Sequence, residues 1–392
     1  MSCRMSLKTA IQLHLDIFKE PHYHLKWENH IAFAKGNEEV DVTIRDKWVH
    51  ALQFLQSILG AGFLKGERKH PLHQMITSKY CLGIEALIEF STILECIKSS
   101  CDSYPKLFSK IASANLFRKE GKPFAEIAYR YLKIGFEIDF PNEIQGQINP
   151  DILASNTSSG DILYIEVSQL EESNDRKILK QNYDVLWNAL EFTDHLPYCC
   201  QQLRPITQDE MVGLIENIKK IKLKALDHCQ LVHYSDDKIR LAVAHTEKYD
   251  QLIQWIEDND YRKGLLGIHL NFNETKRISN YKIKAKARQI PVNGTGLIYI
   301  PVNTLFFWGI DLEQAITSIE RQLQGYANVF GIVLYGYLQT PVKTSNVSLN
   351  DHYFSVKNMD NGLSRFLVFI RNSHYTGSTK AETIDAIYKS FE

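Results

Sequence analysis

The segment from residue 147 to residue 168, QINPDILASNTSSGDILYIEVS, constrains the fold of this 392-residue chain more than any other stretch. Two apolar runs, Ile148–Ala154 and Ile162–Val167, flank a turn-rich segment, Asn156–Asp161. Short apolar runs separated by polar turn residues are typical of two antiparallel strands. The sequence therefore predicts a β-hairpin here.

The register of this hairpin decides which side chains meet. If the turn centres between Ser158 and Ser159, Asp151 lies directly opposite Glu166. Like charges that face each other on a sheet repel, and a bound divalent cation is the simplest way to stabilise them. Alternatively, the hairpin is exposed and its two acids are only solvated.

The order of predicted elements resembles the PD-(D/E)xK nuclease superfamily. That family has a helix with an acid, a strand, a Pro-Asp pair that opens the next strand, and a strand that ends in Glu-x-Lys. The corresponding features of this chain are Glu126 in the predicted helix Phe124–Ile134, the predicted strand Phe136–Phe140, Pro150-Asp151 and Glu166-Val167-Ser168. Ser168 stands where the family pattern has lysine.

The resemblance implies a fold and a chemistry. The fold is α/β, with a restriction-endonuclease-like mixed sheet flanked by helices. The chemistry is hydrolysis of phosphodiester bonds in nucleic acid, with DNA as the expected substrate, by a Mg²⁺ or Mn²⁺ ion bound to Asp151 and Glu166. Glu126 would contribute a third acid, although its spacing alone favours a solvent-facing helix glutamate.

A second stretch, from Lys276 to Gln289, is cationic and contains no acid. Like charges repel, so a phosphate backbone is a reasonable partner, and solvated surface is the alternative. In some members of the superfamily the catalytic lysine has moved to a neighbouring element. Lys286 is our candidate to replace the missing lysine, and Lys284 is the second choice. The residues of this stretch predicted to bind nucleic acid are Lys276, Arg277, Lys282, Lys284, Arg288 and Gln289.

Composition and net charge limit the class of protein, its location and the way it could bind a partner. Hydrophobic residues make up 44% and charged residues 23% of the chain, as in ordinary soluble proteins. The first residues, MSCRMSLKTA, lack a signal-peptide core and no apolar run is long enough to span a membrane, so we expect a cytoplasmic protein without a membrane partner. The net charge is −1, so contact with nucleic acid must come from a local patch.

Changes in periodicity predict two domains. A helical N-terminal domain would span residues 1–118, and the nuclease-like α/β domain residues 119–392, with a helical insertion at about 172–232. The N-terminal domain would recognise a target, form a homodimer or bind another partner.

Three functions remain open from the sequence. The first is a metal-dependent endonuclease. The second is an inactive protein with a nuclease fold that binds nucleic acid or a partner protein. The third is an α/β enzyme of unrelated chemistry, against which the chain shows no G-x-S-x-G, P-loop or H-E-x-x-H motif.

Overall fold

The computed structural model describes residues 22–66, 70–142, 149–168, 173–191, 196–259, 266–270, 277–302, 312–338, 345–349, 352–358 and 364–391. The chain forms two compact units. The main unit comprises Met1–Gln169, Lys282–Val302 and Glu320–Glu392, and the inserted unit comprises Leu170–Tyr281 and Asn303–Ile319. Within the described ranges, every helix is too short or too polar to span a bilayer.

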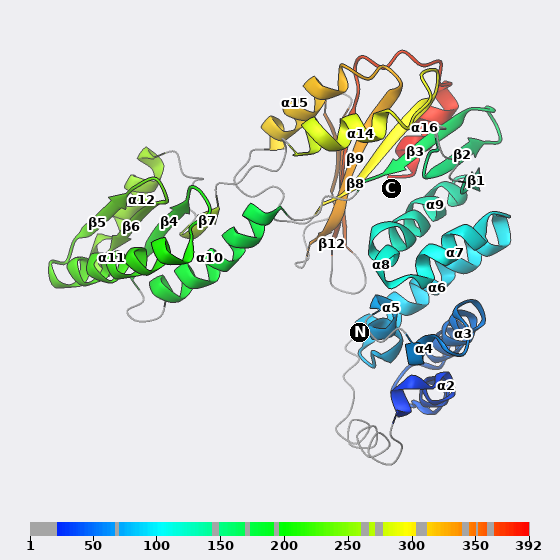
Figure 1. Cartoon of the computed structure of the whole chain (residues 1–392), viewed down its shortest axis with the longest axis horizontal. Coiled ribbons are helices and arrows are strands. Elements are labelled where there is room, and N and C mark those ends of the chain that lie inside the picture. Colours follow the sequence, from blue (N-terminus) through cyan, green and yellow to red (C-terminus); the bar gives the residue numbers. More distant parts are fainter. Residues whose placement is uncertain are drawn as a thin grey trace. The chain divides into compact units, whose positions relative to one another are not determined.

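The main unit is built around an eight-stranded mixed sheet with the order β1-β2-β3-β8-β9-β12-β11-β10 (Figure 1). β3, β8 and β9 run parallel, and the other neighbours are antiparallel. The strands are β1 Phe136–Asp139, β2 Ile152–Asn156, β3 Ile162–Val167, β8 Thr295–Pro301, β9 Val329–Leu338, β10 Ser345–Leu349, β11 His352–Asn358 and β12 Ser364–Arg371.

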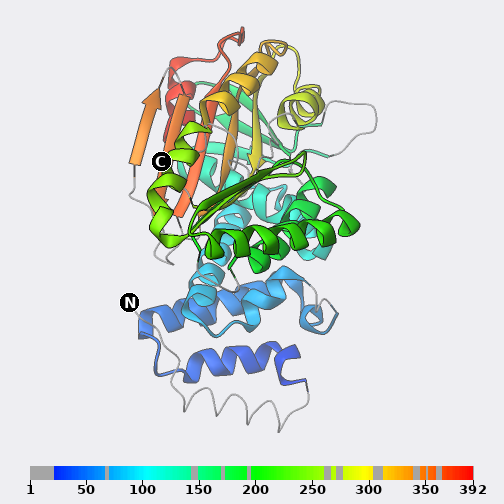
Figure 2. The ribbon, with the colours of Figure 1, turned by 90° about the vertical axis from the view of Figure 1, so that its left-hand side faces the viewer.

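Helices precede the sheet and cover it. In Figure 2, as in Figure 1, the N-terminal helices in blue and cyan form a stack that leads up to the sheet. The helices before the sheet are η1 Tyr23–Leu25, α2 Trp27–Gly36, α3 Val42–Leu59, α4 Phe63–Gly66, α5 Pro71–Thr77, α6 Cys81–Ser100, α7 Tyr104–Ala112, α8 Ala114–Leu116, η2 Phe117–Gly121 and α9 Lys122–Lys133. Later helices of the main unit are α14 Ile283–Ala287 and α16 Ala381–Lys389, whereas η4 Ile278–Lys282 and α15 Leu312–Leu323 contain residues of both units. The predicted α/β class, with helices before a mixed sheet, is confirmed.

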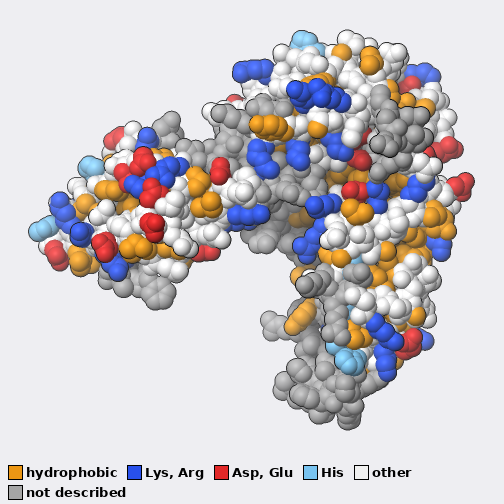
Figure 3. All heavy atoms as spheres, viewed as in Figure 1, with side chains coloured by type: hydrophobic (Ala, Val, Ile, Leu, Met, Phe, Trp, Pro, Cys, Tyr) orange, Lys and Arg blue, Asp and Glu red, His pale blue; other side chains and the backbone are white. Residues whose placement is uncertain are grey.

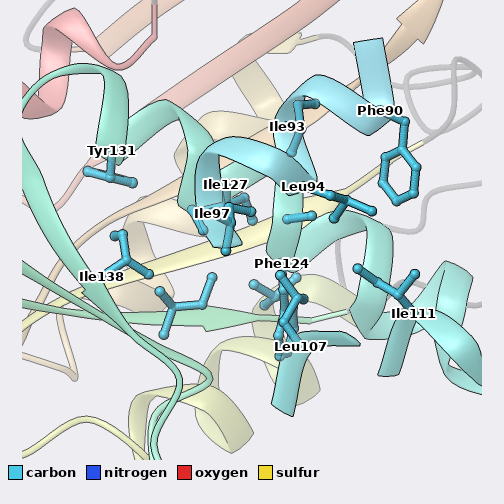
Figure 4. Close-up of a cluster of buried hydrophobic side chains, with 14 of the residues drawn as sticks. Phe90, Ile93, Leu94, Ile97, Leu107, Ile111, Phe124, Ile127, Tyr131 and Ile138 are labelled. Carbon is cyan, nitrogen blue, oxygen red and sulfur yellow. The ribbon is translucent and has the colours of Figure 1, made fainter. Parts of the chain in front are cut away.

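Different helical segments pack on the two faces of the main sheet. Side chains alternate along a strand, so Leu163 and Ile165 point to one face, where they join the core formed with α6 and α9. Figure 4 shows part of that core, in which side chains from α6, α7 and α9 meet those of the sheet. Glu166 points to the other face. There Ile290, just after α14, packs so closely on Gly296 that a Cβ at Gly296 would lie 2.3 Å from it.

The structure divides the chain differently from the boundary expected at residue 118. The core of the main unit is continuous from Trp27 in α2 to Phe391 after α16. The N-terminal helices therefore belong to the same unit as the sheet. The reason is that Phe117 and Phe124, on either side of the expected boundary, are both buried in this one core.

The inserted unit has a sheet of its own, with the order β5-β6-β4-β7. It is thus more than the helical insertion expected at about 172–232. The central strand β4 was missed because its sequence, YCCQQ, lies between two helices rich in Lys and Glu. The elements are α10 Asn174–Glu191, β4 Tyr198–Gln202, α11 Gln208–Asp227, β5 Leu231–Ser235, β6 Ile239–Ala244, η3 Thr246–Lys248, α12 Tyr249–Asp258 and β7 Gly267–Leu270.

Candidate active site

The hairpin has the predicted register. Ile152 of β2 pairs with Ile165 of β3, and one step further along the same register Asp151 lies opposite Glu166. The turn is fixed by Asn156, whose side-chain oxygen accepts hydrogen bonds from the backbone N–H of Ser158 (3.0 Å) and of Ser159 (3.3 Å). This Asx-type turn is local, so the sequence specifies it well.

The two carboxylates have different surroundings. Glu166 is fully buried, with 0% of its surface exposed. Asp151 is half-buried, and its Oδ2 accepts a hydrogen bond from the backbone N–H of Val167 at 2.8 Å. Ser168, which replaces the motif lysine, is buried, and its backbone N–H donates to the carbonyl of Tyr299. Ser168 therefore continues the sheet ladder.

The side chain of Lys286 contacts both Asp151 and Glu166. Its Nζ lies 2.9 Å from Asp151 Oδ2 and 2.8 Å from Glu166 Oε2. The lysine comes from α14, as the cationic stretch predicted, whereas the second choice, Lys284, is exposed. Asn328 holds the end of this segment, because its side-chain amide donates to the carbonyls of Ile290 (2.8 Å) and Pro291 (3.2 Å). A lysine distant in sequence thus reaches the acids at the end of the hairpin.

Burial dominates the electrostatics of this group. Burial, together with the Asp151 carboxylate, raises the pKa of Glu166 well above its ordinary value, although Lys286 opposes the shift. For Lys286, burial alone lowers the pKa, but the attraction of Asp151 and Glu166 outweighs it and the pKa is raised. The site therefore favours a charged lysine and holds a proton on Glu166 more readily than water would.

The donor set fits a hard divalent cation. Glu166 Oε1 is buried and accepts no hydrogen bond within the described part of the chain. An unpaired buried carboxylate oxygen is costly unless a cation or a proton satisfies it. Carboxylate oxygens are the ligands that Mg²⁺ and Mn²⁺ prefer. Asp151 and Glu166 are thus suitable ligands for the ion expected from the sequence.

The structure does not bring Glu126 to this group. Glu126 lies on α9, which packs on the opposite face of the sheet. Its carboxylate forms an ion pair with Lys122, one helical turn away, and accepts a hydrogen bond from the Tyr337 hydroxyl at 3.3 Å. The structure therefore places Glu126 away from Asp151 and Glu166, because α9 presents its carboxylate to a different pocket.

The cationic stretch is helical as far as Ala287, since η4 leads directly into α14, and Arg288 and Gln289 form a turn after it. Lys276 lies outside the described residues. Lys284, Arg288 and Gln289 are exposed, whereas Arg277 and Lys282 are half-buried and have interactions of their own. In Figure 3, Lys and Arg side chains gather on the visible face over α14 and α15. The exposed members of the stretch are available to a large anion.

A second possible ligand group lies in the inserted unit and was missed by the sequence analysis. Cys229 Sγ lies 3.1 Å from His245 Nδ1 and 3.1 Å from Glu247 Oε2, and the ligand atoms of all three residues lie within 4.8 Å of one another. The antiparallel pairing of Leu231 with Ala244 brings the three together. Sequence spacing alone gives no sign of this group, which suits Zn²⁺ better than Mg²⁺.

A comparison with known protein families, with curated proteins and with solved structures finds no match to this chain. The resemblance to the PD-(D/E)xK superfamily therefore stays a prediction from the motif.

Proposed function

We propose that this protein is a metal-dependent nuclease that hydrolyses phosphodiester bonds of nucleic acid, with DNA as the expected substrate. The observation that carries this proposal is the group formed by Asp151, Glu166 and Lys286, in which two acids and one lysine converge at the end of a hairpin. Phosphodiester hydrolysis needs charge neutralisation at the phosphate and an activated water. This group contains the residue types for both tasks.

Each residue has a role in this proposal. Asp151 and Glu166 would hold a Mg²⁺ or Mn²⁺ ion, which when bound supplies positive charge and a water of lowered pKa. Glu166 must lose its proton to act as a ligand. Lys286, whose Nζ contacts both carboxylates, keeps its positive charge and is placed to stabilise negative charge on the scissile phosphate. The exposed Lys284, Arg288 and Gln289 would contact the neighbouring phosphates.

The test is a cleavage assay. Purified protein is incubated with plasmid and with DNA and RNA oligonucleotides, with and without Mg²⁺ or Mn²⁺. We expect metal-dependent cleavage that falls at least about 100-fold in Asp151→Ala, Glu166→Ala and Lys286→Ala. Glu137→Gln, which changes an exposed acid on the neighbouring strand β1, is the control and should retain activity. Equal cleavage by all variants, each with an unchanged circular dichroism spectrum, would reject the proposal.

A second candidate is an inactive protein with a nuclease fold that binds nucleic acid or a partner protein. The favouring observation is that Lys286 already donates to both carboxylates, so the lysine itself can serve as the cation that stabilises them. Calorimetry separates the two functions. A nuclease takes up Mg²⁺ or Mn²⁺ through Asp151 and Glu166, whereas the inactive protein takes up neither ion and retains DNA affinity that is sensitive to salt.

A further inference from the structure

A separate pocket of about 270 Å³ lies on the opposite face of the main sheet. β9 shows which face this is, because Val333 pairs with Tyr299, which pairs with Val167, and residues alternate along each strand. Tyr337 therefore shares the face of Val167, away from Glu166. The lining residues are Glu89, Ile93, Glu126, Tyr129, Arg130, Lys133, Ile134, Tyr337, Lys357, Arg365, Lys389 and Ser390.

Positive charge predominates in this pocket. Glu126 is already engaged by Lys122, which is not a lining residue, and by Tyr337. Among the described lining residues the only other acid, Glu89, is exposed and has an interaction of its own. Against these two acids stand five cations: Arg130, Lys133, Lys357, Arg365 and Lys389. The lining therefore has a clear excess of positive charge.

Two of the cations are neighbours on adjacent strands, on the same face of the sheet. Lys357 of β11 pairs directly with Arg365 of β12, and Arg365 in turn pairs with Tyr337 of β9. Side chains of paired residues project to the same face, about 5 Å apart at their Cβ atoms, so this arrangement sets two like charges side by side. Like charges in this position destabilise a sheet unless a counter-charge compensates them. Lys357 has an interaction of its own, whereas Arg365 has no ion pair among the described residues.

The guanidinium groups of Arg130 and Arg365 add to the excess of positive charge in the pocket. Both residues are half-buried, and within the described ranges neither side chain has a hydrogen bond or an ion pair. Burial, followed by repulsion from Arg130, lowers the pKa of Arg365. A guanidinium offers five donors in a rigid fork that matches phosphate geometry. Among the described residues, the N–H donors of these two guanidinium groups thus have no acceptor.

We propose that this pocket binds a small phosphorylated ligand, with its phosphate held by Arg130 and Arg365. Lys133, Lys357 and Lys389 supply further positive charge around it. The rings of Tyr129 and Tyr337 line the same pocket and offer an apolar surface to the remainder of the ligand. The volume suits a compact ligand, from pyrophosphate to a mononucleotide. The pocket shares no residue with the Asp151 group, so this proposal is independent of the nuclease activity.

The test uses the full chain in a buffer free of phosphate. Binding of pyrophosphate, AMP and inorganic phosphate is measured by calorimetry and by thermal shift, against sodium chloride of equal ionic strength. We expect binding of pyrophosphate or AMP that weakens at least tenfold in Arg365→Gln and in Arg130→Gln. Arg45→Gln, which removes a half-buried arginine of α3 outside the pocket, is the matched control and should bind as the parent does.

The melting temperature of the ligand-free variant shows whether a loss of binding comes from a loss of fold. Because Arg365 lies beside Lys357 and Arg130, its removal relieves repulsion, so the ligand-free Arg365→Gln protein should melt no lower than the parent. Three results would overturn the proposal. The first is that no phosphorylated probe binds better than chloride, and the second is that both arginine variants bind the probe as the parent does. The third is that only an oligonucleotide binds through Arg365, which would assign the pocket to a nucleic-acid backbone.

Discussion

At the scale of single residues, the unusual feature is a fully buried glutamate held beside another acid. Glu166 has 0% exposure, and only one of its two oxygens has a hydrogen-bond partner within the described residues. An isolated buried carboxylate favours its protonated form, and a nearby carboxylate adds to that preference. A protein gains no stability from such a residue at neutral pH, which is consistent with a functional use of its charge.

The raised pKa of Glu166 predicts how stability depends on pH. Burial and Asp151 raise it from 4.5 to about 8, so between these pH values the folded protein binds more protons than the unfolded chain. Stability contributed by this residue is therefore present below about pH 4.5 and is lost as the pH rises to about 8. Glu166→Gln is neutral at every pH. We expect its free energy of unfolding, relative to the parent, to be higher at pH 9 than at pH 5, by on the order of 1 kcal/mol or more.

Urea unfolding at pH 5, 7 and 9 measures this difference. Glu137→Gln, on an exposed position of β1, is the control and should differ from the parent by the same amount at each pH. A constant difference for Glu166→Gln as well would show that Glu166 titrates normally.

Removing Lys286 gives a second prediction at this scale. Lys286→Met leaves Asp151 and Glu166 opposite each other without a cation. We expect a loss of about 2 kcal/mol in the free energy of unfolding at pH 9, above the pKa of Glu166 in the parent. The loss should be smaller at pH 5, because a proton on Glu166 then removes the repulsion. Lys284→Met, two residues away on the same helix and exposed, should have little effect. Equal effects of the two substitutions would contradict a role for the Lys286 ion pairs.

At the scale of elements, the hairpin could be predicted from the sequence, whereas the helices around it could be placed only in part. The register of β2 and β3 follows from a short turn, and a short turn is specified by its own residues. Lys286 could be suggested only through the resemblance to nucleases in which the catalytic lysine lies on a neighbouring element, because the cationic stretch contains four lysines. Glu126 could not be placed, because the face of a sheet on which a helix packs is decided by contacts between distant residues, such as that of Tyr131 with Tyr299.

The turn itself is open to test. Gly160 has φ of +76°, a left-handed conformation that residues with a side chain rarely adopt, and a Cβ there would meet nothing within 4 Å. Gly160→Ala should therefore lower the free energy of unfolding by about 1 kcal/mol through backbone strain alone. Gly36→Ala, in α2 with an ordinary φ and equally open space, should be neutral or slightly stabilising. Chemical unfolding of both variants measures the change in the free energy of unfolding. A larger loss of this free energy in Gly36→Ala than in Gly160→Ala would be inconsistent with strain at Gly160.

At the scale of the whole molecule, each unit has a hydrophobic core built from its own residues. The core around Leu94 contains residues of the main unit only, and the core around Ile218 contains residues of the inserted unit only. This division was not visible in the sequence, since the main unit is assembled from three separate parts of the chain. Local periodicity shows where helices and strands begin and end, and it carries no information on which of them share a core.

Separate cores predict separate responses to core mutations. Ile218→Ala removes a buried side chain from the inserted unit and should cost that unit 2–5 kcal/mol, as is typical of cavity-forming substitutions. Hydrogen exchange at individual backbone amides shows which unit loses stability. We expect faster exchange at the backbone amides of β4 and β6, and unchanged exchange at those of β3 and β8 in the main sheet. Leu94→Ala, in the main core, is the reciprocal variant and should give the opposite pattern. If either substitution accelerates exchange equally in both sheets, the two units unfold together, and the cores are not energetically independent.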